Sequence, residues 1–298
     1  MNKKTIFTIW IPFFAFLVGA LLFAWKNNII FFSNFSRTKT EIPVSTLPAN
    51  VQSVFQYNFS VPGVLYESGT ADESSSPYWW LDSGGQLIVG ENSGKTIHGS
   101  LGSNNNWRLA YANANPEDTN NGYNPQNIFR LITRNTWHDF EQEAYFKIDT
   151  YNISTSINRN ESNGLLLFNR YVDGDNLYYT GIRVDGAAVI KKKYKGVYYT
   201  LAYKQFFPGT YNIVSNPNLL PQNVWIGIRS QVVTSASSTV HIKLYTDIGK
   251  TGNWKLVAEA IDDGISFGGE IIDNIASGGI RTDFMDVDFK DYKIKELE

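Results

Sequence analysis

Short runs of alternating apolar and polar residues recur from Val51 to the end of the chain, separated by clusters of Gly, Asn, Asp and Pro. Successive side chains of a β-strand point to opposite faces, so these runs predict half-buried strands. No long segment beyond residue 50 shows the apolar spacing of an amphipathic helix. The pattern predicts an all-β fold, a β-sandwich formed by residues 51–298 as one domain.

Nine runs are the strongest strand candidates, and four of them follow one another closely. The nine are residues 143–150, 164–171, 176–184, 188–193, 197–204, 224–233, 240–247, 254–259 and 285–295. Asp-Gly or Lys-Gly pairs at 173–174, 185–186 and 195–196 separate the second to fifth runs. Such pairs supply the positive φ that a tight hairpin requires, so residues 164–204 are expected to form one continuous meander.

The N-terminal segment has a different character, because residues 5–25 carry no charge and are rich in Ile, Phe, Leu and Trp. A helix of about 20 apolar residues can cross the hydrocarbon core of a bilayer. A cleaved signal peptide has a shorter apolar core and small residues at its cleavage site, whereas Leu22 and Phe23 are bulky. We therefore expect residues 1–26 to be an uncleaved transmembrane helix, a signal anchor; a cleaved signal peptide and a buried helix of a soluble domain are the alternatives.

Residues 27–50 turn from apolar to rich in Ser, Thr and Pro, which is typical of an extended juxtamembrane linker. Lys3 and Lys4 precede the apolar run and favour a cytoplasmic N-terminus. The expected location is the cell membrane, crossed once, with the 51–298 domain outside the cytoplasm. The membrane is then one partner of the chain, through its N-terminal helix.

The charge and cysteine content exclude several classes of protein. Lys plus Arg total 26 against 28 Asp plus Glu, which argues against a sequence-independent nucleic-acid binder. The absence of cysteine excludes disulfides, thiol catalysis and Cys-ligated zinc. The three His residues, at 98, 138 and 241, are too widely separated to predict a His-rich metal site.

Four segments in the order NGLLLFNRYVDGDNLYYTGIRVDG, NVWIGIRSQVV, VHIKLYTD and GGIRTDFMDVDFKDYKIKEL resemble the concanavalin A-like lectin/glucanase superfamily, of the LamG or jelly-roll type. Gly279, Ile280 and Arg281 match the superfamily's Gly-Leu/Ile-Arg turn near the C-terminus, and Phe289 matches its closing strand. The superfamily includes lectins, carbohydrate-binding modules, glycoside hydrolases and polysaccharide lyases. The resemblance implies a two-sheet antiparallel jelly-roll sandwich and a poly- or oligosaccharide partner, and it leaves the activity open.

Strand parity predicts which residues could form a glycan-binding surface. Alternate residues from Leu177 to Arg183 share one face of their strand, and those from Tyr178 to Val184 are expected to face the core. In a jelly roll the first set lines the concave sheet, where aromatic rings stack on sugars and polar groups bind hydroxyls. The predicted ligand-binding residues are Asn169, Arg170, Tyr179, Arg183, Lys191, Lys193, Tyr199 and Tyr203.

The run of lysines at 191–193 alternates faces, so one lysine must point away from the other two. Two lysines on the concave face would suit an acidic polysaccharide. The competing interpretation is that the Tyr and Arg residues close the core and the lysines face water.

Catalysis is the alternative to binding alone. Asp286 with Asp288, and Glu141 with Glu143, are same-face carboxylate pairs, but the Glu-x-Asp-x-Glu strand typical of the superfamily's retaining glucanases is absent. Polysaccharide lyases of this fold use Tyr and His, and residues 145–149 share only the opening of their tyrosine motif. We expect a carbohydrate-binding or surface-interaction module with no catalytic residue. A carbohydrate-active enzyme, a lyase before a hydrolase, is the alternative.

One turn carries the residues that could hold a structural calcium ion. Asp173, Asp175 and Asn176 supply hard oxygen ligands within four residues, and three further Asp residues follow near the C-terminus. The alternative is that Asp-Gly-Asp-Asn is simply a good hairpin sequence. No other cofactor is expected.

The predicted topology can be tested on intact cells. If Lys3 and Lys4 remain in the cytoplasm, protease added outside should release residues 51–298 and leave the apolar run in the membrane, as detected by immunoblotting. Protection of that fragment until the membrane is dissolved would contradict an outside location.

Overall fold

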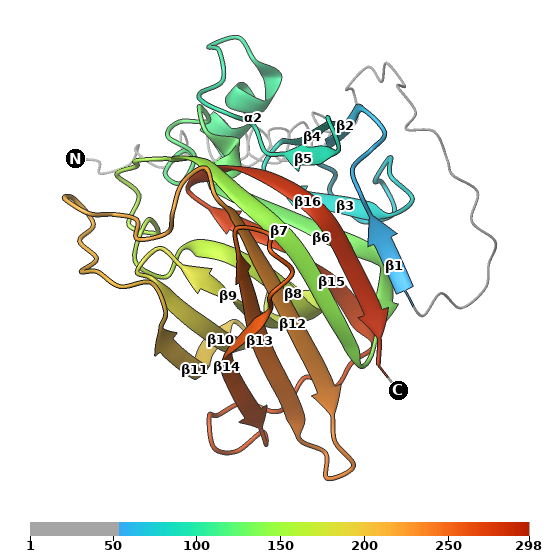
Figure 1. Cartoon of the computed structure of the whole chain (residues 1–298). Coiled ribbons are helices and arrows are strands. Elements are labelled where there is room, and N and C mark those ends of the chain that lie inside the picture. The colour runs from blue at the N-terminus through green and yellow to red at the C-terminus, as the bar shows by residue number, and fades with distance from the viewer. Residues whose placement is uncertain (1–53, 298) are drawn as a thin grey trace, which may run out of the picture. The chain divides into compact units, whose positions relative to one another are not determined.

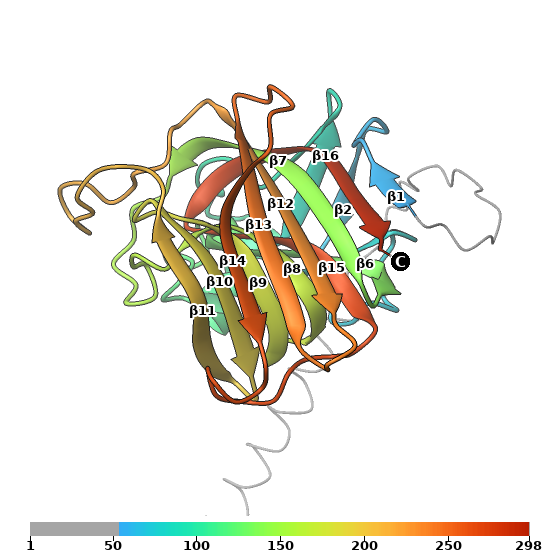
Figure 2. The same ribbon diagram turned by 60° about the horizontal axis from the view of Figure 1, so that its bottom comes forward.

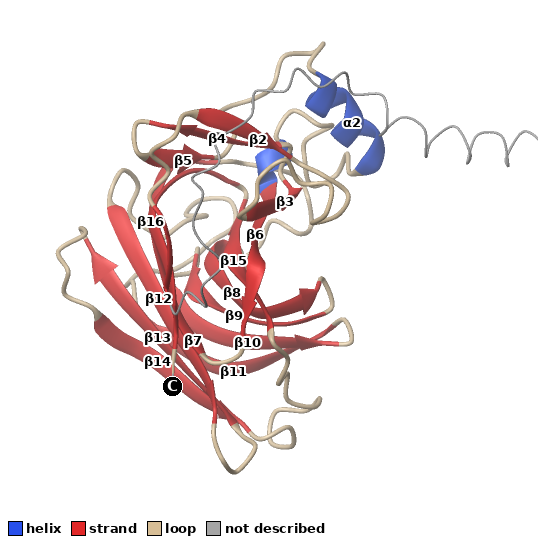
Figure 3. Ribbon diagram, turned by 90° about the vertical axis from the view of Figure 1, so that its right-hand side faces the viewer, coloured by secondary structure: helices blue, strands red, loops and turns tan. Residues whose placement is uncertain are grey.

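The computed structural model describes residues 54–297, which form two antiparallel β-sheets of nine and seven strands packed face to face (Figure 1). Figure 3 shows the two strand layers, with helix α2 at the end of the sandwich where β2, β4 and β5 lie. The predicted all-β, two-sheet antiparallel sandwich is confirmed. The predicted transmembrane anchor at 1–26 and the linker at 27–50 lie outside the described residues. Among residues 54–297, no helix has the length and apolar character needed to cross a bilayer.

The strands follow a different order across each sheet than along the chain. From one edge to the other, the nine-stranded sheet contains β14 (Lys255–Asp262), β13 (Val240–Ile248), β12 (Trp225–Thr234), β7 (Phe140–Tyr151), β16 (Met285–Glu296), β5 (Ser93–Lys95), β4 (Gln86–Gly90) and β2 (Gly63–Tyr66), with β1 (Val54–Tyr57) paired to β16. The seven-stranded sheet contains β11 (Val197–Gln205), β10 (Ala187–Tyr194), β9 (Asn176–Arg183), β8 (Gly164–Asp173), β15 (Ala276–Asp283), β6 (Ile128–Trp137) and β3 (Trp79–Ser83). The described helices are α2 (Asn106–Ala114) and the 3-10 helix η1 (Pro125–Asn127).

All nine predicted strands are present, as β7 to β14 and β16. The predicted meander is β8 to β11, whose strands are neighbours in chain order. In Figure 2, β7, β12, β13 and β14 also run side by side. The last two strands instead enter the middle of the sheets, β15 between β8 and β6, and β16 between β7 and β5. The expected Gly279–Arg281 turn is therefore wrong, because these residues lie within β15.

Helix α2 is the element that the alternation pattern does not predict. It has no apolar stripe, and only Tyr111 among its residues is buried. It begins because the Asn105 side chain accepts hydrogen bonds from the backbone N–H groups of Trp107 and Arg108. A local cap therefore produces a helix where hydrophobic periodicity gives no signal.

The core lies between the sheets and is rich in aromatic rings from both. The Phe129 ring of β6 stacks on Phe289 of β16 at 5.3 Å, and Trp79 of β3 meets Tyr292 of β16 at 4.7 Å. All four side chains are 1% exposed or less. Burial of such rings contributes roughly 2–3 kcal/mol each. Contacts between β16 and the seven-stranded sheet thus join the two layers.

One lysine of the 191–193 run points into this core, as alternation requires. The Lys192 ammonium lies 2.8 Å from Asp262, and neither side chain is exposed. The ammonium also donates to the Gly269 carbonyl, and the Tyr178 hydroxyl donates to Asp262 at 2.6 Å. Burial and the Asp262 carboxylate raise the pKa of Tyr178, so it remains a neutral donor. The buried charges are thereby paired and hydrogen-bonded.

We predict that Asp262→Ala destabilises the protein by about 3–5 kcal/mol, because Lys192 would remain buried without a counter-charge. The neighbouring control, Lys193→Met, loses a pair with the exposed Asp175 and an exposed hydrogen bond to the Gly174 carbonyl, and should cost less than about 1 kcal/mol. Urea unfolding followed by tryptophan fluorescence measures both. Equal effects of the two substitutions would contradict this account.

Candidate functional site

The seven-stranded sheet has a second apolar cluster on the face turned away from the core, which we call the outer face. Its members are Ile132, Leu166, Phe168, Tyr171, Leu177, Tyr179, Ala187 and Val189, with Trp80 packed against them. Strand register places Phe168, Tyr179 and Lys191 in one row across β8, β9 and β10. The predicted parity of β9 is confirmed, since Tyr178 and Ile182 belong to the core whereas Leu177 and Tyr179 belong to the outer face.

Five cationic side chains from four strands surround this cluster. Four of them pair with carboxylates: Arg130 with Asp82 at 2.7 Å, Arg183 with Asp185 at 2.9 Å, Lys193 with Asp175 at 2.9 Å and Arg281 with Asp283 at 2.8 Å. Lys191 is the exception. Within residues 54–297 it has no hydrogen bond or ion pair, and its ammonium lies over the rings of Tyr198 at 5.4 Å and Tyr179 at 5.9 Å.

The electrostatic surroundings of Lys191 are positive. Burial lowers the pKa of Lys191, and the charges of Arg183 and Arg281 lower it further, while Glu161 opposes them. A half-buried ammonium among guanidinium groups gains stability from any anion that reaches it. The outer face therefore favours a negatively charged group at this point.

A small hollow of about 40 Å³ opens on the outer face beside Tyr179. Aromatic and aliphatic side chains and three cations line it, and no carboxylate does. The lining residues are Arg130, Phe168, Tyr171, Gly174, Leu177, Tyr179, Lys193, Tyr198 and Arg281. Such a mixture of apolar and cationic lining groups is typical of a subsite for a polar ligand group.

The tyrosines of the outer face differ in exposure. Tyr198 is 48% exposed and Tyr203 53% exposed, whereas Tyr179 is only 5% exposed. Tyr198 covers Tyr179 edge to face at 6.1 Å, and the Arg183 guanidinium lies 5.5 Å from the Tyr203 ring. Tyr179 is thus the floor of the face, and Tyr198 and Tyr203 are the rings that a ligand can stack on.

Five of the eight predicted ligand-binding residues lie on the outer face: Tyr179, Arg183, Lys191, Lys193 and Tyr203. The structure brings them together as predicted, although it buries the ring of Tyr179. Whether they bind a ligand stays a prediction. The other three, Asn169, Arg170 and Tyr199, point toward the interior.

Asn169 is a correction to the predicted surface. It is fully buried, and its side-chain oxygen accepts hydrogen bonds from Gln142 at 2.9 Å and Ser230 at 2.6 Å. Both donors belong to the nine-stranded sheet, on β7 and β12. Asn169 therefore links the two sheets inside the core.

Arg170 is also a correction, and its cause is a β-bulge. Its φ of 48° and a shift in the pairing of β8 with β9 turn its side chain to the same side as Asn169. The buried guanidinium donates to Asp139, Asp273 and Thr234, and to the carbonyls of His138 and Ile272. All its hydrogen-bonding capacity is used within the protein, so Arg170 cannot bind a ligand.

The prediction that Tyr199 lies on the binding surface is wrong by one residue, again because of a bulge. A register shift in the pairing of β10 with β11 puts Tyr198 and Tyr203 on one face, although they are five residues apart. Tyr199 pairs across from the buried Lys192, and its ring packs against the core. Regular alternation places Tyr199 with Tyr203, and only the bulge reveals Tyr198 as the exposed ring.

The proposed calcium ligands do not fit a metal ion. Asp173 accepts hydrogen bonds from the Asp175 backbone and the Asn176 side chain, while Asp175 pairs with Lys193. The Asn176 side-chain oxygen accepts from the Lys195 backbone. These oxygens serve the hairpin instead of converging on one point. Within the described range, no group of three or more His, Cys, Asp or Glu side chains could hold a metal.

The two same-face carboxylate pairs considered for the enzyme alternative make other contacts. Asp286 accepts hydrogen bonds from Gln126 and Asn152, whereas Asp288 pairs with Lys147 at 2.8 Å. Glu141 and Glu143 bind Gln231 and Arg229, on β12 of the nine-stranded sheet.

The histidines are also remote from the outer face. His98 lies beside Asp288, His138 between Asp139 and Asp273, and His241 beside Thr239. The Tyr/His set of a polysaccharide lyase is therefore not assembled there.

Sequence reasoning missed Arg130 and Arg281, which line the hollow, and two acids near them. Burial raises the pKa of the Asp82 carboxyl group, although the charge of Arg130 acts to lower it. Burial also raises the pKa of Glu67. The Tyr111 hydroxyl donates to the Glu67 carboxylate. In the sequence, Arg281 stands out only as part of a family motif. The pairing of β15 with β6 sets Arg281 across from Arg130, and this pairing places it on the outer face.

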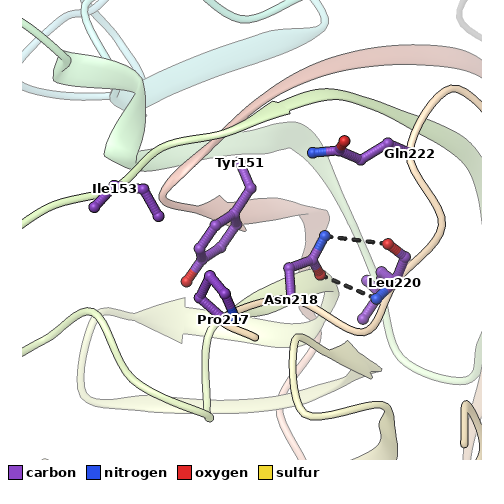
Figure 4. Close-up of a pocket in the computed structure, with 6 residues that line it drawn as sticks. All are labelled: Tyr151, Ile153, Pro217, Asn218, Leu220 and Gln222. Atoms are coloured by element: carbon purple, nitrogen blue, oxygen red, sulfur yellow. Dashed lines mark hydrogen bonds between the residues drawn. The ribbon is translucent and has the colours of Figure 1, made fainter. Parts of the chain in front are cut away.

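A larger pocket of about 360 Å³ lies away from these cations, and no charged side chain lines it. Figure 4 shows Tyr151 and Ile153 on one side, and Asn218 folded back on Leu220. The Asn218 amide both donates to and accepts from the Leu220 backbone, so its polar atoms are already used. The outer face is the better candidate site.

No family model matches the chain, and no curated protein matches it in sequence. Solved structures do resemble it. Carbohydrate-binding module CBM66 from Bacillus subtilis is 12% identical, over 73% of this chain and 95% of that one, with a TM-score of 0.46. Winged bean acidic lectin, complexed with methyl-α-D-galactose, is 10% identical, over 81% and 96%, with a TM-score of 0.43. The GH43 protein BlXynB from Bacillus licheniformis is 8% identical, over 85% and 41%, with a TM-score of 0.43.

These structures include a lectin and a carbohydrate-binding module. With TM-scores below 0.5 and identities of 12% or less, these likenesses identify no ligand or site residue of this chain.

Adjacent tyrosines test the assignment of faces. Tyr199→Ala should destabilise the protein by about 2–3 kcal/mol, because a ring packed on the core is lost. Tyr198→Ala should cost less than about 1 kcal/mol, since its ring is 48% exposed. Urea denaturation of both variants makes the comparison. A larger loss for Tyr198→Ala would reverse the assignment.

Proposed function

We propose that this protein binds carbohydrate on the outer face of its seven-stranded sheet, without cleaving it. The observation that carries the proposal is the exposed Tyr198 ring at the rim of a hollow lined by cationic and aromatic groups. Sugar rings stack their apolar CH faces on such a ring. Guanidinium and ammonium groups beside it donate hydrogen bonds to hydroxyl oxygens. Tyr203, also exposed, extends the surface along β11.

We further propose that the sandwich is held at the outer surface of a cell membrane by residues 1–26. The support is the uncharged run at 5–25 with Lys3 and Lys4 before it. A tethered module would keep a polysaccharide close to the cell. A surface-interaction role without any sugar is the alternative that binding measurements distinguish.

A carbohydrate-active enzyme is the second candidate. Glu67 and Asp82 support it, because burial raises the pKa of both carboxyl groups and Asp82 contacts an arginine of the hollow. A carboxyl group with a raised pKa that lies beside a bound sugar can act as a general acid. Chromatography of any bound polysaccharide after prolonged incubation tests this role. Shortened or unsaturated products would show that the protein cleaves the polysaccharide and does not only bind it.

We predict that a glycan array probed with the full-length chain identifies at least one ligand, and that Tyr198→Ala weakens its binding. The expected loss is about 1–3 kcal/mol, the contribution of a stacked aromatic platform and its adjoining charged hydrogen bonds. Tyr66→Ala is the matched control, since Tyr66 is 52% exposed but belongs to β2 of the other sheet. Equal affinities of the two variants would move the binding site away from the outer face.

A further inference from the structure

The hollow on the outer face has an unusual charge balance for a sheet surface. Arg130, Lys193 and Arg281 line it, and no Asp or Glu does. Lys191 adds a fourth cation beside the same two rings, Tyr179 and Tyr198. The paired carboxylates contact these cations from outside the lining, so positive groups face the hollow.

The two arginines keep hydrogen-bonding capacity for a ligand. Arg130 and Arg281 both contact their carboxylates through Nε. Within residues 54–297, no hydrogen bond reaches the terminal nitrogens of either guanidinium. Both side chains are accessible, at 38% and 29% exposure. Terminal guanidinium nitrogens are the atoms that bind carboxylate and sulfate oxygens in a fork geometry.

The size of the hollow limits what can enter. Its volume of about 40 Å³ is too small for a sugar ring. It suits one small anionic substituent, because pockets that enclose a whole small molecule are far larger, at about 300–1,000 Å³. The ring that bears the substituent would then rest on the exposed Tyr198 at the rim.

We propose that the hollow is a subsite for the anionic group of an acidic saccharide, a carboxylate or a sulfate ester. Arg130 and Arg281 bind the group from the neighbouring strands β6 and β15. Lys191 and Lys193 complete its positive surroundings. This inference rests on the proposed carbohydrate binding and specifies its ligand class. The protein's formal net charge of −2 makes attraction by overall charge a poor explanation of such binding.

The first test varies the charge of the ligand and keeps its sugar. The immobilised full-length chain is exposed to polygalacturonate and to its fully methyl-esterified form, and separately to dextran sulfate and dextran. We expect at least one charged polymer to bind about tenfold or more tightly than its neutral counterpart, as loss of a charged hydrogen bond implies. The first pair reports a carboxylate ligand and the second a sulfate.

The second test varies the hollow and controls for the protein's charge. The double variant Asp82→Asn/Arg130→Gln removes a guanidinium and its carboxylate together, so net charge is unchanged and no charge is left unpaired. Lys191→Met removes the cation that has only ring contacts. Lys204→Met, on the adjacent strand β11, is its matched control because Lys204 is exposed and lies across from Ala188, away from the hollow.

We expect the double variant and Lys191→Met to weaken binding of the charged polymer about tenfold, and Lys204→Met to leave it unchanged. Melting temperature is measured for each variant, so a misfolded one is recognised and replaced by Arg130→Lys, which keeps the charge and loses the fork.

Four results would overturn the inference, and they separate it from the proposed function. Equal binding of charged and neutral polymers would leave carbohydrate binding standing and remove the acidic subsite. Equal loss of polymer binding in Lys191→Met and Lys204→Met would show general attraction of polyanions. Binding of duplex DNA by the full-length chain as tightly as the charged polymer would show the same. Failure to bind any of these polymers or any glycan on the array would overturn the proposed function as well.

Discussion

The packing of two sheets through one shared core is the constraint on which the other features depend. Each strand sends alternate side chains inward, so a charged or strongly polar residue at an inward position destabilises the fold unless it finds a partner inside the protein. Lys192 finds Asp262, and Asn169 finds Gln142 and Ser230 of the opposite sheet. These contacts join the layers as the aromatic rings do. They also decide which polar residues remain for the surface.

Two β-bulges then determine the composition of the outer face. The bulge at Arg170 turns a charged side chain inward, where Asp139 and Asp273 neutralise it, and returns Tyr171 to the outer cluster. The bulge opposite Lys191 exchanges Tyr199 for Tyr198. Without these shifts, two strands would present different residues to solvent. The candidate site therefore depends on irregularities of the sheet as much as on its regular pairing.

The inner and outer charges of the seven-stranded sheet are balanced differently. Inside, Arg170 and Lys192 are fully enclosed, and protein groups satisfy their hydrogen bonds. Outside, Arg130 and Arg281 contact a carboxylate through Nε alone, and Lys191 rests on tyrosine rings. Buried charges without partners would destabilise the fold by several kcal/mol, whereas accessible ones can be left for a ligand. This difference separates structural cations from candidate binding cations on the same strands.

The sequence by itself determined the fold class, the nine strands from β7 to β14 and β16, the meander from 164 to 204, and the parity of β9, because all of these follow from local alternation and hairpin residues. It also placed Arg183, Lys191, Lys193 and Tyr203 on one face. Only the tertiary structure decided that Arg281 and Arg130 lie opposite each other, because β15 and β6 are far apart in the chain. It alone decided that Asn169, Arg170 and Tyr199 point inward, since bulges and ion-pair partners arise from strand pairing that no local pattern records.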